Sequence, residues 1–276
     1  QPYFGGSLWA PDLFWDGRAT SEFHDPVTDE IMIPSGGGLE SQSVGPIVSS
    51  VEMAKEGRAW DEVTSKLEQV TPLLIATNIP QAMQDAIVTD PTYPDLFARA
   101  FGDPQITPTR IAFAIATYER TLVADQTPWD RFIAGDESAL NGQEQVVWNL
   151  LRTPASLGGS ACADCHRWDN DIVGGVVPFP TFPTDRVLDL SQDGIFTDNT
   201  FVNLGFAHAD ADVGREGVTG NADDRGAFKT PGLRNLGLRR TFFHNGRATS
   251  LEEVMFIYNQ DIFLDIFDPD TLQISP

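Results

Sequence analysis

The sequence is short of basic residues and of long apolar stretches. Of its 276 residues, 18 are Lys or Arg and 40 are Asp or Glu, so the net charge is −22. Phosphate backbones and anionic lipids repel such a chain, which argues against nucleic-acid binding and membrane-surface binding. The same charge keeps a protein soluble and would attract a basic protein partner. The longest apolar run, Ile111–Ala116, has six residues against the ~20 that span a bilayer, so we expect no transmembrane segment.

Length and composition indicate a folded protein. A chain of 276 residues corresponds to a little under two domains of ~150 residues and can fold without disulfides. Hydrophobic residues make up 41% and charged residues 21%, values ordinary for a globular protein and unlike those of a disordered one. The chain opens on Gln1-Pro2-Tyr3 rather than on methionine, which fits the removal of a leader from an exported protein.

Apolar periodicity predicts helices over much of the chain after residue 50. The expected helices cover residues 51–67, 80–88, 93–101, 107–124, 141–151 and 250–260. Side chains suited to an N-cap begin three of them: Thr107, Asn141 and Ser250. The first fifty residues are expected to be loop-rich, because the triplet Gly36–Gly38 is unsuited to a helix. Residues 158–224 lack helical periodicity and are rich in Gly, Pro and Asp, which predicts long loops.

One segment of eight residues occurs twice. Residues 14–21 read FWDGRATS and residues 243–250 read FHNGRATS, so six of the eight positions agree at an offset of 229 residues. This agreement is far above what chance gives over eight positions. We interpret it as the trace of a duplicated half-protein, with one copy of a common unit near each end of the chain.

The only two cysteines of the sequence lie in one short motif. Cys162, Cys165 and His166 form Cys-x-x-Cys-His, the attachment pattern of c-type haem. Two thiols at this spacing can form thioethers with both vinyl groups of one porphyrin, and the adjacent histidine then offers its imidazole to the iron. A thioredoxin-like pair would need no histidine, and a zinc site would need a second ligand pair. The motif therefore predicts one covalently bound haem c.

Several blocks of sequence, in this order, resemble the bacterial di-haem cytochrome c peroxidase and MauG-type family. The blocks are FWDGRA (14–19), LESQ (39–42), GPI (45–47), VEM (51–53), IAFAIATYERTL (111–122), CADCH (162–166), FKTPGLRN (228–235) and FHNG (243–246). The resemblance implies a mainly α protein of two cytochrome c-like haem domains related by pseudo-twofold symmetry, with long loops and little β structure. Residues 1–130 would form the N-terminal domain, without its haem-attachment segment. Residues 131–276 would form the C-terminal domain, which carries the haem motif.

The resemblance further implies a periplasmic, or otherwise exported, oxidoreductase that reacts with hydrogen peroxide. It would reduce peroxide with electrons from a donor protein, or use peroxide to oxidise a partner protein through high-valent haem. The acidic surface fits a donor such as a small basic cytochrome or a cupredoxin. Two functions of other classes stay open. One is a mono-haem electron-transfer protein without peroxidase activity, and the other is an assembly module with a structural haem.

The resemblance also implies roles for individual residues. Trp15 matches the tryptophan that relays electrons between the two haems. Glu52 and Gln42 match polar residues of the peroxide pocket, where Glu52 would move a proton between the peroxide oxygens. From its position alone, Glu52 could equally be a carboxylate at a helix N-terminus. Tyr258, fourteen residues after His244, stands where the family places the distal ligand of the haem iron.

Met255 and Tyr258 compete for that distal position. They share one face of the expected helix, and spacing alone leaves open whether both are core residues. A phenolate favours oxidised iron and a thioether favours reduced iron, so tyrosine at the family position indicates the MauG-type variant.

The chain departs from the family in two places. It has one haem motif, and moving Cys162 back by 229 residues gives a position before residue 1. The second haem is therefore expected on a segment that precedes Gln1. An insertion lies between Ser21 and Leu39, beside the predicted peroxide pocket. Calcium is a candidate further cofactor, because family members often bind it through backbone carbonyls at the places occupied here by Arg239 and Thr241.

Overall fold

The computed structural model is mainly helical, as expected. It describes residues 11–122, 124, 126–153, 158–160, 162–166, 196–197, 199–205, 212–259, 267–268 and 273–274. The strands in these ranges have two or three residues each and form two-stranded antiparallel pairs. In the described part of the chain, no helix has the length and apolar character needed to cross a membrane. The chain divides into two compact units, residues 21–119 and residues 1–20 with 120–276.

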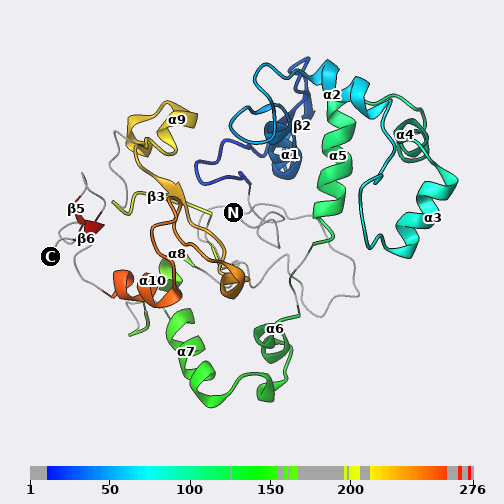
Figure 1. The fold of residues 1–276 in the computed structure, drawn as a ribbon. Coiled ribbons are helices and arrows are strands. Elements are labelled where there is room, and N and C mark those ends of the chain that lie inside the picture. Colours follow the sequence, from blue (N-terminus) through cyan, green and yellow to red (C-terminus); the bar gives the residue numbers. More distant parts are fainter. Residues whose placement is uncertain are drawn as a thin grey trace. The chain divides into compact units, whose positions relative to one another are not determined.

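The unit of residues 21–119 is organised around two packed helices. Helices α1 (Gly38–Val48) and α5 (Pro108–Glu119) lie side by side (Figure 1). The other elements of this unit are β1 (Phe23–His24), β2 (Ile31–Ile33), α2 (Trp60–Leu67), α3 (Gln81–Thr89) and α4 (Tyr93–Phe101). A core cluster of this unit has the buried apolar side chains Trp60, Phe97, Ile106 and Ile111.

Helix α1 shows that the expectation of loops up to residue 50 is wrong for residues 38–48, while residues 11–37 hold turns, bends and two short strands. The helix begins at Gly38 and contains Pro46 two residues before its end. Glycine at the first helical position costs less than in the middle of a helix, but proline in the last turn still removes one hydrogen bond of the helix. Leu39 is only 2% exposed, and the helix packs along α5, so burial overrides weak local propensity. The helix expected at 51–67 begins instead at Trp60, after a series of turns.

The remaining helix predictions are confirmed, with boundaries shifted by up to five residues. Helix α4 covers the expected range, and α3 lies one residue later than expected. Helix α5 ends at Glu119 rather than near residue 124. All three predicted caps are confirmed. The side-chain oxygen of Thr107 accepts from the amide of Arg110 at 3.2 Å, and those of Asn141 and Ser250 accept from Glu144 and Glu253 at 3.0 and 3.1 Å.

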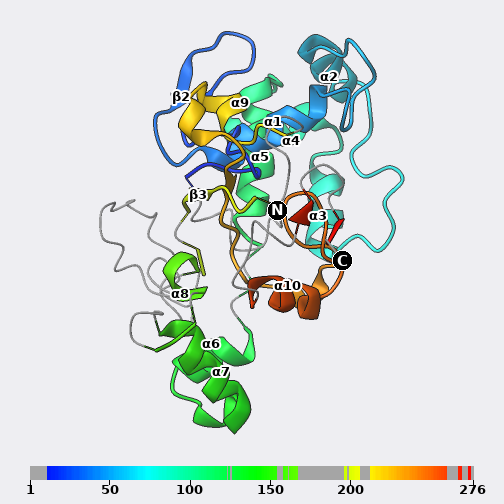
Figure 2. The same cartoon turned by 90° about the vertical axis from the view of Figure 1, so that its left-hand side faces the viewer.

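The second unit contains the haem motif. Its elements are α6 (Pro128–Ile133), α7 (Gly142–Arg152), α8 (Cys162–Cys165), β3 (Phe201–Val202), α9 (Glu216–Thr219), β4 (Phe228–Lys229), α10 (Leu251–Tyr258), β5 (Phe267–Asp268) and β6 (Gln273–Ile274). Helix α8 lies beside α7 (Figures 1 and 2). The buried cluster next to the second repeat copy consists of Phe242, Ala248 and Ile257.

The first residues of the chain group with its C-terminal part rather than with residues 21–119. The contacts that join them run from residues 12–17 to Arg215 and Lys229. The expected division into cytochrome c-like domains at residue 130, and their pseudo-twofold relation, stay predictions.

Candidate functional site

Helix α8 presents the two cysteines on a single helical turn. Both thiols are partly buried and are not joined in a disulfide. The amide of His166 donates to the carbonyl of Cys162 at 2.7 Å, which continues the helical turn into the histidine. Residues three apart on a helix lie on one side of it, so the thiols of Cys162 and Cys165 share a face.

The ring of His166 is oriented by a backbone carbonyl thirty residues further along the chain. Its Nδ1 lies 2.9 Å from the carbonyl oxygen of Phe196. Because a carbonyl oxygen only accepts hydrogen bonds, Nδ1 carries the proton and Nε2 presents a lone pair. Two thiols and an imidazole in this tautomer are the donor set of a haem c site. The residues present therefore fit a covalently attached haem, which Cys162 and Cys165 would hold and to whose iron His166 would be a ligand.

Tyr258, at the end of α10, lies within electrostatic reach of both cysteines. Burial raises the pKa of Tyr258 to about 12, with further contributions from the thiols of Cys165 and Cys162. The Tyr258 ring also neighbours that of Phe243, with 6.0 Å between centroids. Met255 on the same helix is 59% exposed, against 39% for Tyr258.

The repeat predicted from the sequence is also a repeat in local structure. In the first copy, the amide of Leu13 donates to the carbonyl of Ala19 at 2.7 Å. In the second copy, the amide of Phe242 donates to the carbonyl of Ala248 at 2.8 Å. Each pair forms an isolated antiparallel bridge that closes the loop, and the two bridges are offset by 229 residues, as the sequence repeat is.

The loops inside the two bridges also share their unusual backbone angles. Phe14 and Phe243 both adopt the left-handed region, with φ of 67° and 63°. Gly17 and Gly246 follow with φ of 72° and 71°. Left-handed phenylalanine is rare and persists only where the surroundings determine it. The duplicated sequence therefore encodes one specific loop, and Trp15 occupies in the first copy the place that His244 occupies in the second.

Arg215 clamps the loop that carries the tryptophan. Its Nη1 donates to the carbonyls of Asp16 and Gly17, both at 3.1 Å. Its Nη2 pairs with the carboxylate of Asp12 at 3.1 Å. The guanidinium lies 4.2 Å above the ring of Phe201. Sequence reasoning missed this arginine, because nothing local marks a residue that acts two hundred positions away.

Lys229 holds the same loop from a second direction. Its amide donates to the carbonyl of Trp15 at 2.8 Å, and its ammonium group donates to the carbonyl of Asp12. The side chain is only 3% exposed, and burial lowers the pKa of Lys229 to about 8 against the opposing effect of Asp12. Lys229 thus holds the backbone of Trp15, Arg215 holds the two residues that follow it, and Trp15 is itself partly buried.

The clamp predicts that Gly17→Ala destabilises the protein. A Cβ at Gly17 would lie 2.1 Å from Nη1 of Arg215 and 2.6 Å from the ring of Phe201. We expect the free energy of unfolding to fall by about 1–3 kcal/mol, measured by denaturant titration. Gly57→Ala is the matched control, since Gly57 has φ of 73° and nothing within 4 Å of the added Cβ. Equal losses in the two variants would show that the clamp contributes nothing beyond backbone strain.

The residues expected in the peroxide pocket lie in one segment of the other unit. Gln42 is 6% exposed in α1, and Glu52 is exposed in the turns that follow this helix. The carbonyl of Pro46 accepts the amide of Met53 at 3.3 Å, and that of Ser49 accepts the amide of Glu52 at 3.1 Å. These bonds tie the turns to the end of α1. Because α2 begins only at Trp60, the alternative of Glu52 as a helix N-terminal carboxylate is wrong.

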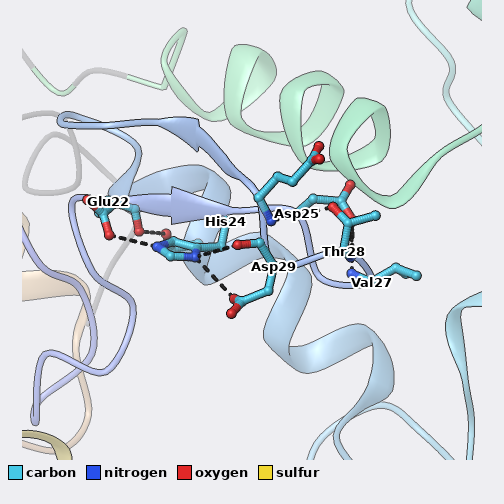
Figure 3. A network of polar contacts seen from close by, with 8 residues as sticks. Glu22, His24, Asp25, Val27, Thr28 and Asp29 are labelled. Atoms are coloured by element: carbon cyan, nitrogen blue, oxygen red, sulfur yellow. Dashed lines mark hydrogen bonds and ion pairs between the residues drawn. The ribbon is translucent and has the colours of Figure 1, made fainter.

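The insertion before α1 forms the hairpin of β1 and β2 and carries a polar network that sequence reasoning missed (Figure 3). His24 lies 2.7 Å from Glu22 through Nε2 and 3.1 Å from Asp29 through Nδ1. The hydrogen bond to the Glu22 carboxylate raises the pKa of His24. Asp25 accepts a short hydrogen bond from the hydroxyl of Thr109, which anchors the insertion to α5.

The chain is similar to di-haem cytochrome c peroxidases and to MauG proteins. The model of the family described as di-haem cytochrome c peroxidase matches residues 2–138. Cytochrome c551 peroxidase of Nitrosomonas europaea is 29% identical over 88% of this chain and 52% of its own length. The methylamine utilization protein MauG of Methylophilus methylotrophus is 26% identical over 92% of this chain and 56% of its own length. The chain spans about half the length of these curated relatives.

Two solved structures share the fold. The di-haem peroxidase BthA of Burkholderia thailandensis aligns with a TM-score of 0.56 at 19% identity, over 90% of this chain and 51% of that one. A MauG-like protein associated with microbial copper homeostasis aligns with a TM-score of 0.54 at 22% identity, over 91% and 59%. Identities this low support the mainly α fold and carry no conclusion about substrate.

Proposed function

This chain belongs to the di-haem cytochrome c peroxidase and MauG family, and on that premise we propose that it is a haem c oxidoreductase that reacts with hydrogen peroxide. The observation that carries the proposal is the turn of Cys162, Cys165 and His166, in which the imidazole tautomer leaves Nε2 as a metal donor. When bound, haem c supplies a redox-active iron. We place the protein in the periplasm or another exported compartment.

We assign the residues of this chain the following parts. Cys162 and Cys165 would attach the haem, and His166 and Tyr258 would supply protein ligands to its iron. In the peroxide pocket, Gln42 orients peroxide and Glu52 moves a proton between its oxygens. Trp15 relays electrons between the haems. Glu52 is exposed to solvent, where it can exchange protons. Trp15 is partly buried in the loop that Arg215 and Lys229 hold, which suits an electron relay.

The distal ligand can be tested by a pair of substitutions in α10. We expect Tyr258→Phe to change the ferric haem spectrum, because the protein ligand is lost or replaced by water, and to raise the midpoint potential. Met255→Leu, in a side chain one turn away and 59% exposed, should leave both unchanged. Absorption and electron paramagnetic resonance spectra of the ferric protein measure the effect. A methionine-type spectrum that disappears in Met255→Leu would contradict the assignment.

A second haem and a protein partner complete the proposal. The sequence holds one Cys-x-x-Cys-His motif, and the second haem named in the family's description would be attached outside residues 1–276. The net charge of −22 supports a basic cytochrome or cupredoxin as electron donor. Calcium stays a candidate near Arg239 and Thr241. The single motif equally supports the second candidate function, a mono-haem electron-transfer protein. Haem-loaded protein that accepts electrons but consumes no peroxide would identify that function.

A further inference from the structure

We propose that the buried ion pair of Asp130 and Arg234 is a positioning device for His166, acting through Phe196, and that it sets the reduction potential of the attached haem. This inference rests on the proposed haem site. It concerns residues that form no part of the haem motif and that lie far from it in the sequence. Its elements are the ion pair, a cluster of aromatic rings and the carbonyl that accepts the hydrogen bond from His166.

The ion pair is bidentate and almost fully buried. Nη2 of Arg234 lies 2.7 Å from one carboxylate oxygen of Asp130, and Nη1 lies 3.1 Å from the other. The two side chains are 7% and 1% exposed. Nη1 also donates to the carbonyl of Ala124 at 2.6 Å, and Asp130 accepts the amide and hydroxyl of Thr127 at 2.8 and 2.6 Å. The pair is therefore held rigidly at the start of α6, because each charged group has several partners.

Three aromatic rings connect this pair to the segment that faces His166. The guanidinium of Arg234 lies 5.4 Å from the ring of Trp129 and 5.9 Å from that of Phe196, within range of cation–π attraction. The rings of Trp129 and Phe196 meet edge to face at 4.9 Å between centroids. Trp148 of α7 completes the cluster, at 5.4 Å from Trp129 and 6.2 Å from Phe196. The position of the Phe196 ring is thus determined from three directions.

The backbone of Phe196 adopts a conformation that needs such support. Its φ is 58°, in the left-handed region that a bulky residue rarely occupies unless its surroundings impose it. The next residue is tied down as well, since the hydroxyl of Thr197 donates to the carbonyl of Thr230 at 2.6 Å. The amide of Thr230 in turn donates to the carbonyl of Thr200 at 2.9 Å. Thr230 lies four residues before Arg234. One segment of chain therefore supplies both the contact to Thr197 and the contact to the ring of Phe196.

The consequence for chemistry follows from the hydrogen bond between Nδ1 of His166 and the carbonyl of Phe196. A strong acceptor on Nδ1–H increases the basicity of Nε2, which stabilises ferric iron relative to ferrous iron. If the carbonyl moves away, the imidazole donates less electron density and the reduction potential rises. Removing the ion pair should therefore shift the potential, although Asp130 and Arg234 lie outside the haem motif in the sequence.

The test compares Arg234→Gln with Arg225→Gln in the haem-loaded protein. Arg225 also forms an ion pair, with Glu216 of α9, but the side chains of this pair are 41% and 22% exposed. At a fixed potential, we expect Arg234→Gln to change the ratio of ferric to ferrous protein by about tenfold in favour of ferrous iron. Loss of a hydrogen-bond partner of a metal ligand typically has effects of about this size. The iron–histidine stretching frequency in resonance Raman spectra should fall. Arg225→Gln should change neither quantity.

Arg234→Gln leaves the Asp130 carboxylate buried without its partner, which can prevent folding. Two further variants test the inference in that case. The double variant Asp130→Asn/Arg234→Gln removes both charges, and Trp148→Phe loosens the ring cluster without touching the pair. Both should shift the potential and the stretching frequency in the same direction, Trp148→Phe by less. Wild-type potential and frequency in these folded variants would overturn this inference alone. Absence of haem at His166 in the wild-type protein would overturn it together with the proposed function.

Discussion

We expect Cys162→Ala/Cys165→Ala to carry no covalently bound haem. Each thiol would form one thioether, so a single replacement would leave at most one covalent link and a weaker attachment. The structure adds a reason why the loss should be complete, since both thiols are on the single turn of α8 that leads into His166. Haem staining after denaturing electrophoresis and the pyridine haemochrome spectrum measure the covalent haem directly.

A control for this experiment is available two residues before the motif. Ser160→Ala removes a hydroxyl that donates to the carbonyl of Leu150 at 3.2 Å, and leaves both thiols in place. We expect this variant to keep its full content of haem. Covalent haem at the same site in the double cysteine variant would show that the assignment of the motif is wrong.

The second large effect is expected from Glu52→Gln. General acid–base catalysis by a positioned carboxylate typically contributes a factor of about 10²–10⁴, and glutamine of the same shape cannot carry the proton. We therefore expect peroxide turnover to fall by about 10²–10⁴-fold, measured as the initial rate at saturating electron donor. Haem content and thermal stability should stay at wild-type values, since the Glu52 side chain is exposed in the turns after α1.

Glu56→Gln is the matched control for that experiment. Glu56 is also exposed, lies four residues later in the same series of turns, and carries the same charge. Its replacement should leave turnover unchanged, which separates proton transfer from a general effect of one negative charge on the docking of a basic donor. A similar loss in both variants, or none in Glu52→Gln, would remove Glu52 from the mechanism.

Local signals in the sequence predicted much of the fold. The helices near residues 141–151 and 250–260 carry both apolar periodicity and the capping side chains Asn141 and Ser250, and each is confirmed within two residues where the structure describes it. Helix α1 escaped prediction because its glycine and proline oppose a helix locally, while packing along α5 favours it. Burial of this kind depends on contacts with residues distant in the sequence, so a local stretch of sequence does not predict it.

In the candidate site too, the residues of a local motif could be predicted, and their partners far along the chain could not. The haem motif is contiguous, so Cys162, Cys165 and His166 could be identified from spacing alone. The acceptor of His166 lies thirty residues away at Phe196, in a stretch without periodicity. The partner of Asp130 is 104 residues distant at Arg234. The Thr-x-x-Asp pattern at Thr127 could have marked Asp130 as a capping residue, but it does not indicate the arginine.

The repeat was recognisable from the sequence, but the contacts that hold its first copy were not. Identity at six of eight positions predicted a common unit, and the two copies do form the same bridged loop. The clamp of Arg215 and Lys229 on the first copy could not be predicted, because both residues reach it across about two hundred positions of chain.

The central claim is that this chain serves peroxide chemistry at haem c, and peroxide-driven oxidation of an electron donor tests it most directly. The haem-loaded protein is mixed with a reduced, basic c-type cytochrome at low ionic strength, and donor oxidation is followed on addition of hydrogen peroxide. We expect continuous turnover that slows as salt screens the acidic surface, because the donor is attracted by the net charge of −22. Rapid electron exchange with the donor but no consumption of peroxide would contradict the claim.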